Sequence, residues 1–164
     1  MDKECVFNGG ENLLLEKIKK VFLFKDLSED EIIKISPLGE IVTFSEGEKL
    51  FNEGDVGDAF YIILKGQIRI SKFIKGVGEE ALAILEEGDY LGEMALICDF
   101  PRSATAIAHT DSKLLKIKRE NFEKILKDVE ISYKILWNLN YILSTRLRET
   151  NEKIKSLILI LLQQ

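Results

Sequence analysis

Hydrophobic residues change their spacing twice along the chain, and these changes divide it into three parts. Over residues 1–38, apolar positions recur every three or four residues, which predicts an N-terminal helical segment. Ser28 followed three residues later by Glu31 is a capping box, so a short helix is expected to begin there. Residues 39–118 hold short apolar runs between turns, and residues 119–164 return to helical spacing. We therefore expect helices on both sides of a β-rich core.

The middle part of the chain is predicted to form a jelly-roll-like β-roll. Many of its apolar runs are separated by turns that combine glycine with an acidic residue, such as Gly54-Asp55 and Gly88-Asp89. Strands at such short intervals favour a sandwich or jelly roll over alternating strand–helix units. The predicted strands are residues 41–44, 49–51, 59–64, 67–73, 80–85, 103–108 and 113–117. The expected fold class is therefore mainly β with flanking helices.

The last part of the chain is predicted to contain one long helix, from about residue 130 to the end, because neither Pro nor Gly interrupts it. One face of this helix carries a heptad seam with alternating spacings of four and three. The members of the seam are Leu136, Asn140, Leu143, Leu147, Thr150, Ile154, Leu157 and Leu161. Such a seam favours pairing with a second helix, and it is longer than one small β-roll can cover. We therefore expect a parallel homodimer through residues 136–161; the alternative is a helix that lies on its own domain's sheet.

The segment Leu91–Thr105 (LGEMALICDFPRSAT) carries the strongest indication of function. It places a Gly-Glu pair before a short helix-forming run, residues 93–97, and a Pro-Arg-Ser step follows. A helix start offers unpaired backbone N–H groups, and Arg102 offers a planar, permanently charged group that matches phosphate oxygens. Glu93 would be unfavourable beside an anion unless it accepts hydrogen bonds from a neutral group such as a sugar hydroxyl. Together these features suggest a cyclic nucleotide.

The same segment resembles the phosphate-binding cassette of cyclic nucleotide-binding domains, as in the catabolite activator family and protein kinase A regulatory subunits. The matching residues are Gly92, Glu93, Met94, Ala95, Leu96, Pro101, Arg102, Ser103 and Ala104. The resemblance implies that the Gly92 backbone and Glu93 bind the ribose 2′-hydroxyl, while Arg102 binds the cyclic phosphate. The alternative is a salt bridge from Arg102 to Glu93 or Asp99, which would brace a loop in a pocket that has lost its ligand.

The resemblance implies further contacts to the same ligand. The hydroxyl of Ser103 would bind the phosphate, and so would backbone amides of the helix-forming run, including those of Met94 and Ala95. In the bacterial catabolite-activator branch, a Thr and the residue after it face the purine base, one from each subunit. Thr150 and Asn151 match those positions, although polar residues at a seam can also set the register of an ordinary coiled coil. The implied ligand is cAMP, and the alternative is cGMP.

The resemblance covers about residues 15–160 and implies a sensor rather than a complete regulator. In the transcription-factor branch the long helix leads into a winged helix-turn-helix, and no such DNA-binding domain is recognised in these 164 residues. We therefore expect a cyclic-nucleotide sensor coupled to a homodimer helix. The alternatives are the sensor part of a Crp/Fnr-type transcription regulator and a dimerisation module without ligand.

Composition narrows the functions that remain. The net charge of −5 argues against nucleic-acid binding by this chain, because binding to a phosphate backbone needs a basic face. One histidine, His109, and two cysteines, Cys5 and Cys98, are too few for the usual zinc or iron–sulfur sites, and no catalytic set can be assembled. We expect no enzyme, metal or cofactor. The chain has neither a membrane-length apolar run nor a signal-peptide core, so a cytoplasmic protein without membrane contact is expected.

Overall fold

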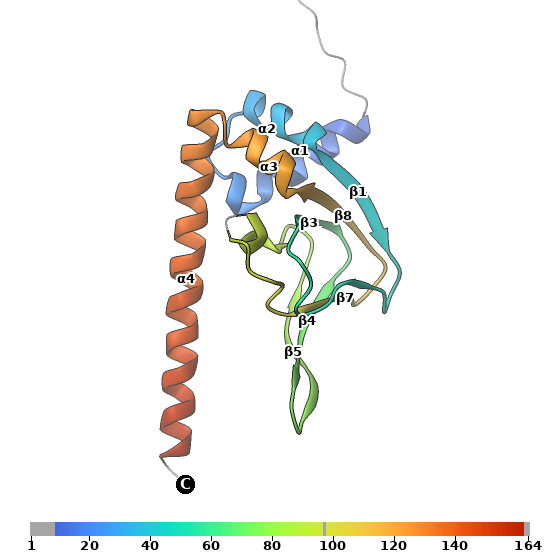
Figure 1. The fold of residues 1–164 in the computed structure, drawn as a ribbon. Coiled ribbons are helices and arrows are strands. Elements are labelled where there is room, and N and C mark those ends of the chain that lie inside the picture. Colours follow the sequence, from blue (N-terminus) through green and yellow to red (C-terminus); the bar gives the residue numbers. More distant parts are fainter. Residues whose placement is uncertain (1–8, 97, 163–164) are drawn as a thin grey trace, which may run out of the picture.

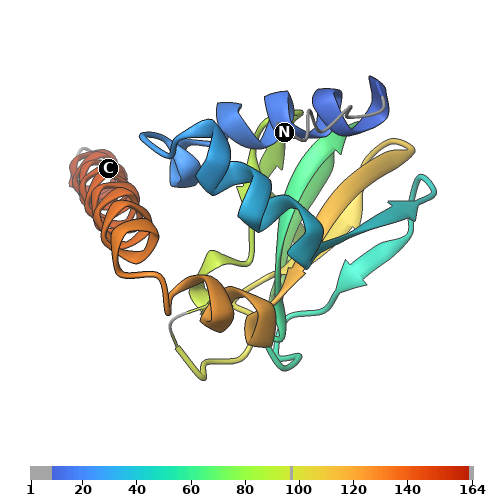
Figure 2. The ribbon, with the colours of Figure 1, turned by 90° about the horizontal axis from the view of Figure 1, so that it is seen from above.

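The chain folds into two β-sheets that share a core, with helices over one end and along one side (Figure 1, Figure 2). The computed structural model describes residues 9–96 and 98–162. The elements in chain order are α1 (Gly9–Lys20), η1 (Phe22–Phe24), α2 (Glu29–Ile35), η2 (Ser36–Leu38), β1 (Gly39–Phe44), β2 (Lys49–Phe51), β3 (Ala59–Lys65), β4 (Ile68–Ile74), β5 (Gly78–Leu85), β6 (Tyr90–Leu91), η3 (Glu93–Leu96), β7 (Thr105–Ala108), β8 (Ser112–Lys118), α3 (Arg119–Ile125) and α4 (Val129–Leu161). The predicted fold class, mainly β with flanking helices, is confirmed.

Strand β3 lies inside the first sheet and is buried on both faces. This sheet has the order β1-β8-β3-β6 and the second has the order β2-β7-β4-β5, with all paired strands antiparallel. Because side chains alternate along a strand, Phe60 and Ile62 pack toward the helices, while Tyr61 and Ile63 pack between the sheets. Burial on both faces explains why the sequence of β3, AFYIILK, is apolar almost throughout.

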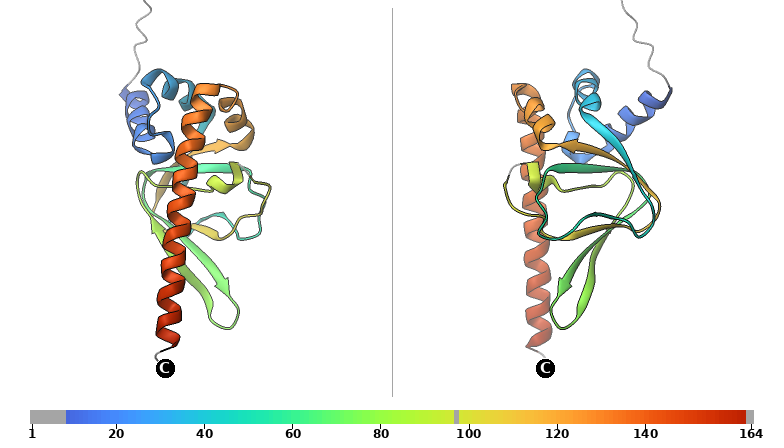
Figure 3. Two further views of the ribbon diagram at one scale, coloured as in Figure 1. Left: turned by 90° about the vertical axis from the view of Figure 1, so that its left-hand side faces the viewer. Right: turned by 45° about the vertical axis from the view of Figure 1, so that its right-hand side comes forward.

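The hairpin of β4 and β5 extends beyond the rest of the β-roll, in the same direction as α4 (Figure 1, Figure 3). Gly76 in its turn has a φ of +88°, a conformation that glycine adopts without steric cost. At the base of the hairpin, Ile70 lies opposite Ala83 and Ile68 lies opposite Leu85. The base of the hairpin, at the end away from the projecting turn, therefore presents an apolar wall.

Helix α4 has a packed half and a free half. Its first half is buried on one face through Ile135, Leu139 and Ile142. From residue 144 to residue 162, every residue is exposed. The predicted seam over 136–161 is largely exposed in the single chain, so the homodimer stays a prediction. No helix in the described part of the chain is long and apolar enough to cross a membrane.

Candidate functional site

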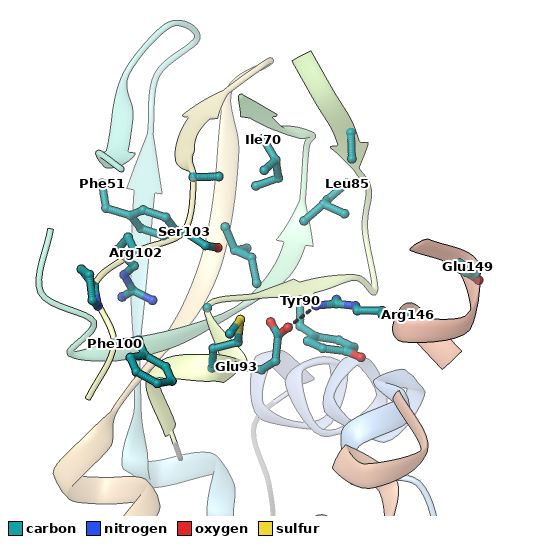
Figure 4. A pocket seen from close by; sticks show the side chains of 16 residues that line it. Phe51, Ile70, Leu85, Tyr90, Glu93, Phe100, Arg102, Ser103, Arg146 and Glu149 are labelled. Atoms are coloured by element: carbon teal, nitrogen blue, oxygen red, sulfur yellow. Dashed lines mark hydrogen bonds and ion pairs between the residues drawn. The ribbon is translucent and has the colours of Figure 1, made fainter. Parts of the chain in front are cut away.

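A cavity of about 420 Å³ opens between the base of the β4–β5 hairpin, the segment after β6 and helix α4 (Figure 4). Its apolar wall includes Phe51, Ile70, Ala83, Leu85 and Phe100. Its polar lining includes Glu93, Arg102, Ser103, Arg146 and Glu149. The volume suits a small molecule, and the mixture of an apolar wall with a few convergent polar groups is typical of ligand sites.

Arg102 is a buried cation with unpaired hydrogen-bond donors. Its side chain donates through Nη2 to the carbonyl oxygen of Ala59 (2.7 Å) and lies 3.4 Å from the Asp58 carboxylate. The guanidinium carbon lies 4.2 Å from the ring centroid of Phe51 and 5.9 Å from that of Tyr61. Within the described residues, Nε and Nη1 have no acceptor. Burial lowers the pKa of Arg102, but arginine stays protonated in proteins, so its two unpaired donors need a hydrogen-bond acceptor, and an anion would be the strongest one.

The acidic residues proposed to brace Arg102 have other partners. Asp99 forms an ion pair with Arg119, and Glu93 forms one with Arg146. In the described part of the chain, neither carboxylate is paired with Arg102. The alternative salt bridge from Arg102 to Glu93 or Asp99 is therefore not formed in this structure; Arg102 pairs instead with Asp58 through Nη2, and its Nε and Nη1 have no acceptor among the described residues.

Gly92 lets the backbone approach the guanidinium closely. Strand β6 pairs with β3 through Leu91 opposite Tyr61, and this pairing delivers Gly92 to the floor of the cavity. Gly92 has a φ of +79°, and a Cβ placed there would lie 2.4 Å from Nη1 of Arg102. Glycine is therefore needed both for the backbone conformation and for the space.

Glu93 connects the cavity to helix α4. Its side chain is buried, with 4% of the residue's surface exposed, and its carboxylate pairs with Arg146 of α4. The Arg146 guanidinium carbon also lies 5.7 Å from the ring centroid of Tyr90. Burial raises the pKa of Tyr90 to about 12, so the phenol beside this ion pair stays neutral. A ligand group that binds Glu93 would therefore act directly on the contact between α4 and the β-roll.

The structure brings some of the predicted site residues together at the cavity and places others outside it. Of the predicted residues, the cavity is lined by Gly92, Glu93, Met94, Arg102 and Ser103. Ala95 is outside the residues whose side chains are described. Thr150 and Asn151 are exposed on α4, and neither belongs to the lining of the cavity in the single chain. The Thr150 hydroxyl donates to the Arg146 carbonyl oxygen of its own helix (2.8 Å). The base contacts of Thr150 and Asn151 remain predictions.

Among the lining residues that sequence reasoning missed are the two charged residues from α4, Arg146 and Glu149. Their signal is helical spacing: they follow buried Leu139 and Ile142 along the same stripe of α4, at steps of three and four residues. The stripe changes from apolar to charged where α4 passes the cavity. Within the described residues, no group of three or more His, Cys, Asp or Glu side chains could hold a metal ion.

The sequence of this chain is similar to one protein family and to several known proteins. The cyclic nucleotide-binding domain family matches residues 41–129. The cAMP-dependent protein kinase regulatory subunit of Emericella nidulans is 38% identical over 113 residues, which cover 69% of this chain and 27% of that protein. The cGMP-dependent protein kinase egl-4 of Caenorhabditis elegans is 34% identical over 119 residues, covering 71% of this chain and 15% of that kinase.

A crystal structure has the same fold. The catabolite activator protein of Thermus thermophilus matches with a TM-score of 0.75 at 30% sequence identity, over 83% of this chain and 62% of that chain. The chain thus spans about a quarter of the matched regulatory subunit and less of the matched kinase. The similarity covers part of each relative and not its full length.

Proposed function

The chain belongs to the family of cyclic nucleotide-binding domains, and on that premise we propose that it is a sensor that binds a cyclic nucleotide in this cavity. The observation that carries the proposal is Arg102, a buried cation whose Nε and Nη1 lack acceptors beside an apolar cavity. cAMP is the first candidate ligand, because Thr150 and Asn151 match the positions that face the purine in the catabolite-activator branch. cGMP is the second candidate.

The ligand in this proposal lies with its charge on the buried side of the cavity. The cyclic phosphate accepts hydrogen bonds from Arg102, and the Ser103 hydroxyl adds one more. The ribose 2′-hydroxyl donates to the carboxylate of Glu93, which is buried and also pairs with Arg146. The base lies against the apolar wall, which includes Ile70 and Leu85.

Ligand binding would reach α4 through the ion pair between Glu93 and Arg146. A ribose hydroxyl on Glu93 competes with Arg146 for the same carboxylate oxygens, and the phosphate adds negative charge nearby. The ligand can shift α4 only as far as its affinities for the two arrangements differ. The output is therefore a change in the position of α4 relative to the β-roll.

The free half of α4 is proposed to pair with the same helix of a second copy through residues 136–161. A second candidate is the sensor part of a DNA-binding transcription regulator. It is favoured by the similarity to a catabolite activator protein, of whose chain 62% is covered. Both candidates use the same ligand site and the same helix.

A thermal-shift panel with cAMP, cGMP, 5′-AMP and a cyclic dinucleotide tests the ligand assignment. At a ligand concentration of 100 times Kd, binding stabilises the folded state by about 2.7 kcal/mol, which corresponds to a rise in Tm of about 5–10 °C for a domain of this size. We expect this rise with a cyclic mononucleotide and none with 5′-AMP. If no cyclic mononucleotide raises Tm, the proposed function is wrong.

Replacing Gly92 with alanine is expected to weaken cyclic-nucleotide binding, because the new Cβ would displace the Arg102 guanidinium. The matched control is Gly88→Ala. Gly88 also has a positive φ, +91°, but a Cβ there meets no atom within 4 Å. Both variants should lose about 1–2 kcal/mol of stability from backbone strain. Calorimetric titration should show at least about tenfold weaker binding for Gly92→Ala alone, given the close fit of charged hydrogen bonds. Equal affinities for the two variants would contradict the role of Gly92.

A further inference from the structure

A lysine on β4 contacts the segment that is proposed to hold the ligand phosphate. Nζ of Lys72 lies 3.1 Å from the Glu53 carboxylate and donates to the carbonyl oxygen of Ser103 (3.4 Å). Neither Lys72 nor Glu53 lines the cavity, and the proposed binding mode uses neither. This inference rests on the proposed function: we propose that Lys72 is a second cation for the ligand phosphate, and that Glu53 lowers the affinity for the ligand by pairing with it.

The register of β4 places Lys72 on the face of the strand that meets the cavity. Side chains alternate along a strand, so Lys72 is on the same face of β4 as Ile70, which lines the cavity (Figure 4). Ser71 lies opposite Thr105 where β4 pairs with β7. Lys72 therefore lies beside the residues just before β7, of which Ser103 lines the cavity.

The turn that carries Glu53 is joined to the phosphate-binding segment by its backbone. The N–H of Gly54 donates to the Arg102 carbonyl oxygen (2.9 Å), and the Arg102 N–H donates to the Asp55 carbonyl oxygen (2.8 Å). The Glu53 N–H donates to the Thr105 hydroxyl (3.0 Å). None of these bonds uses the Glu53 carboxylate, so a substitution that removes its charge should leave the turn in place.

Lys72 does not pair with the carboxylate that the sheet places opposite it. Glu80 of β5 is its cross-strand partner, and opposite charges at such positions attract one another. Nζ pairs instead with Glu53, and among the described residues no ion pair within 4.0 Å joins Lys72 to Glu80. The ammonium group is therefore directed toward Ser103 and the proposed phosphate position rather than across the hairpin.

The ammonium group of Lys72 is close to the proposed phosphate position on the scale of electrostatic screening. Ser103 alone separates them, because its carbonyl oxygen contacts Nζ and its hydroxyl is proposed to bind the phosphate. That span is comparable with the Debye length of roughly 8 Å at physiological salt. Lys72 therefore attracts the phosphate, and the Glu53 carboxylate beside it offsets most of this attraction. Changing either member of this neutral pair alone changes the charge that the ligand meets.

Calorimetric titration of the parent, Lys72→Met, Glu53→Gln and the double variant tests this inference with each cyclic nucleotide that the parent binds. Lys72→Met leaves the negative charge of Glu53 uncompensated and should weaken binding about three- to tenfold, whereas Glu53→Gln leaves Lys72 unpaired and should tighten binding by a similar factor. The double variant again has a neutral pair and should bind as the parent does. The effects should be equal for cAMP and cGMP, since they act on the phosphate.

Three control variants and a salt series separate an effect of charge from an effect of structure. Lys72→Arg keeps the charge and should keep the affinity of the parent. Lys75→Met and Glu46→Gln make the same charge changes in the hairpin turn and in the β1–β2 turn, outside the cavity lining, and should have little effect. Raising the salt concentration from about 0.05 M to about 0.5 M should reduce the differences between the variants, because salt screens exposed charges.

The possible outcomes separate this inference from the function on which it rests. If Lys72→Met and Glu53→Gln both weaken binding, the pair only holds the segment in place, and a second cation is wrong. If neither changes the affinity, Lys72 does not act on the ligand. If the parent binds no cyclic mononucleotide, the proposed function fails, and this inference fails with it. Only opposite effects of the two variants, which cancel in the double variant, support the inference.

Discussion

Replacing Arg102 with alanine is expected to weaken cyclic-nucleotide binding severely while the chain stays folded. The phosphate would lose its charged partner in a buried site, at a cost of about 2–5 kcal/mol by analogy with broken buried charge pairs. That cost corresponds to a Kd about 30-fold to several thousand-fold higher. Calorimetric titration with cAMP and cGMP measures the loss, and the Tm of the unliganded variant shows whether the fold survives.

The fold should tolerate this substitution because Arg102 costs the unliganded protein part of its stability. Two of its buried donors, Nε and Nη1, have no acceptor within the described residues, and such groups cost about 1–3 kcal/mol each. Removing them offsets the lost contacts with Ala59 and Phe51. The control is Arg69→Ala, which removes a half-exposed arginine paired with Glu79 away from the cavity and should leave the affinity unchanged. If Arg102→Ala bound cAMP as tightly as the parent, the site would be assigned wrongly.

Much of the fold could be predicted from the local pattern of apolar residues and turns. Where the predicted strands differ from the observed ones, the causes are local. The predicted strand 49–51 has the observed limits, and 59–64 differs from β3 by one residue, because apolar runs between turns identify strands directly. Strand β6 was missed because two residues are too few for any periodicity; pairing with β3 alone holds it in place. The strand predicted from residue 103 begins at Thr105, because Ser103 and Ala104 line the cavity instead.

The candidate site also combines residues that are close together in the sequence with residues from a distant helix. Gly92, Glu93 and Arg102 fall within one short segment, so their spacing alone indicated a shared ligand. Arg146 and Glu149 enter the cavity only because α4 packs its apolar stripe on the β-roll and continues past the hairpin. That packing fixes which face of a long helix meets the cavity. The seam pattern, which was visible in the sequence, describes a different face.

Replacing Ile154 with glutamate is expected to convert a dimer into a monomer, whereas Leu159→Glu should not. The two side chains are matched in the single chain, where 49% of Ile154 and 52% of Leu159 is exposed, so neither change should destabilise the monomer much. Only Ile154 lies on the predicted seam; Leu159 lies between the seam residues Leu157 and Leu161, on the opposite side of the helix.

The difference between the two variants should be large because a dimer carries each substitution twice. Losing two buried isoleucines costs about 3–6 kcal/mol, and two buried carboxylates add a desolvation penalty, so the dissociation constant should rise at least about a hundredfold. Sedimentation equilibrium of the parent and both variants measures it. A parent that is monomeric at micromolar concentration, or equal effects of the two substitutions, would contradict the seam. The free half of α4 would then need a different binding partner, because the apolar residues on all sides of the helix from Leu157 to Leu162 are unfavourable in water.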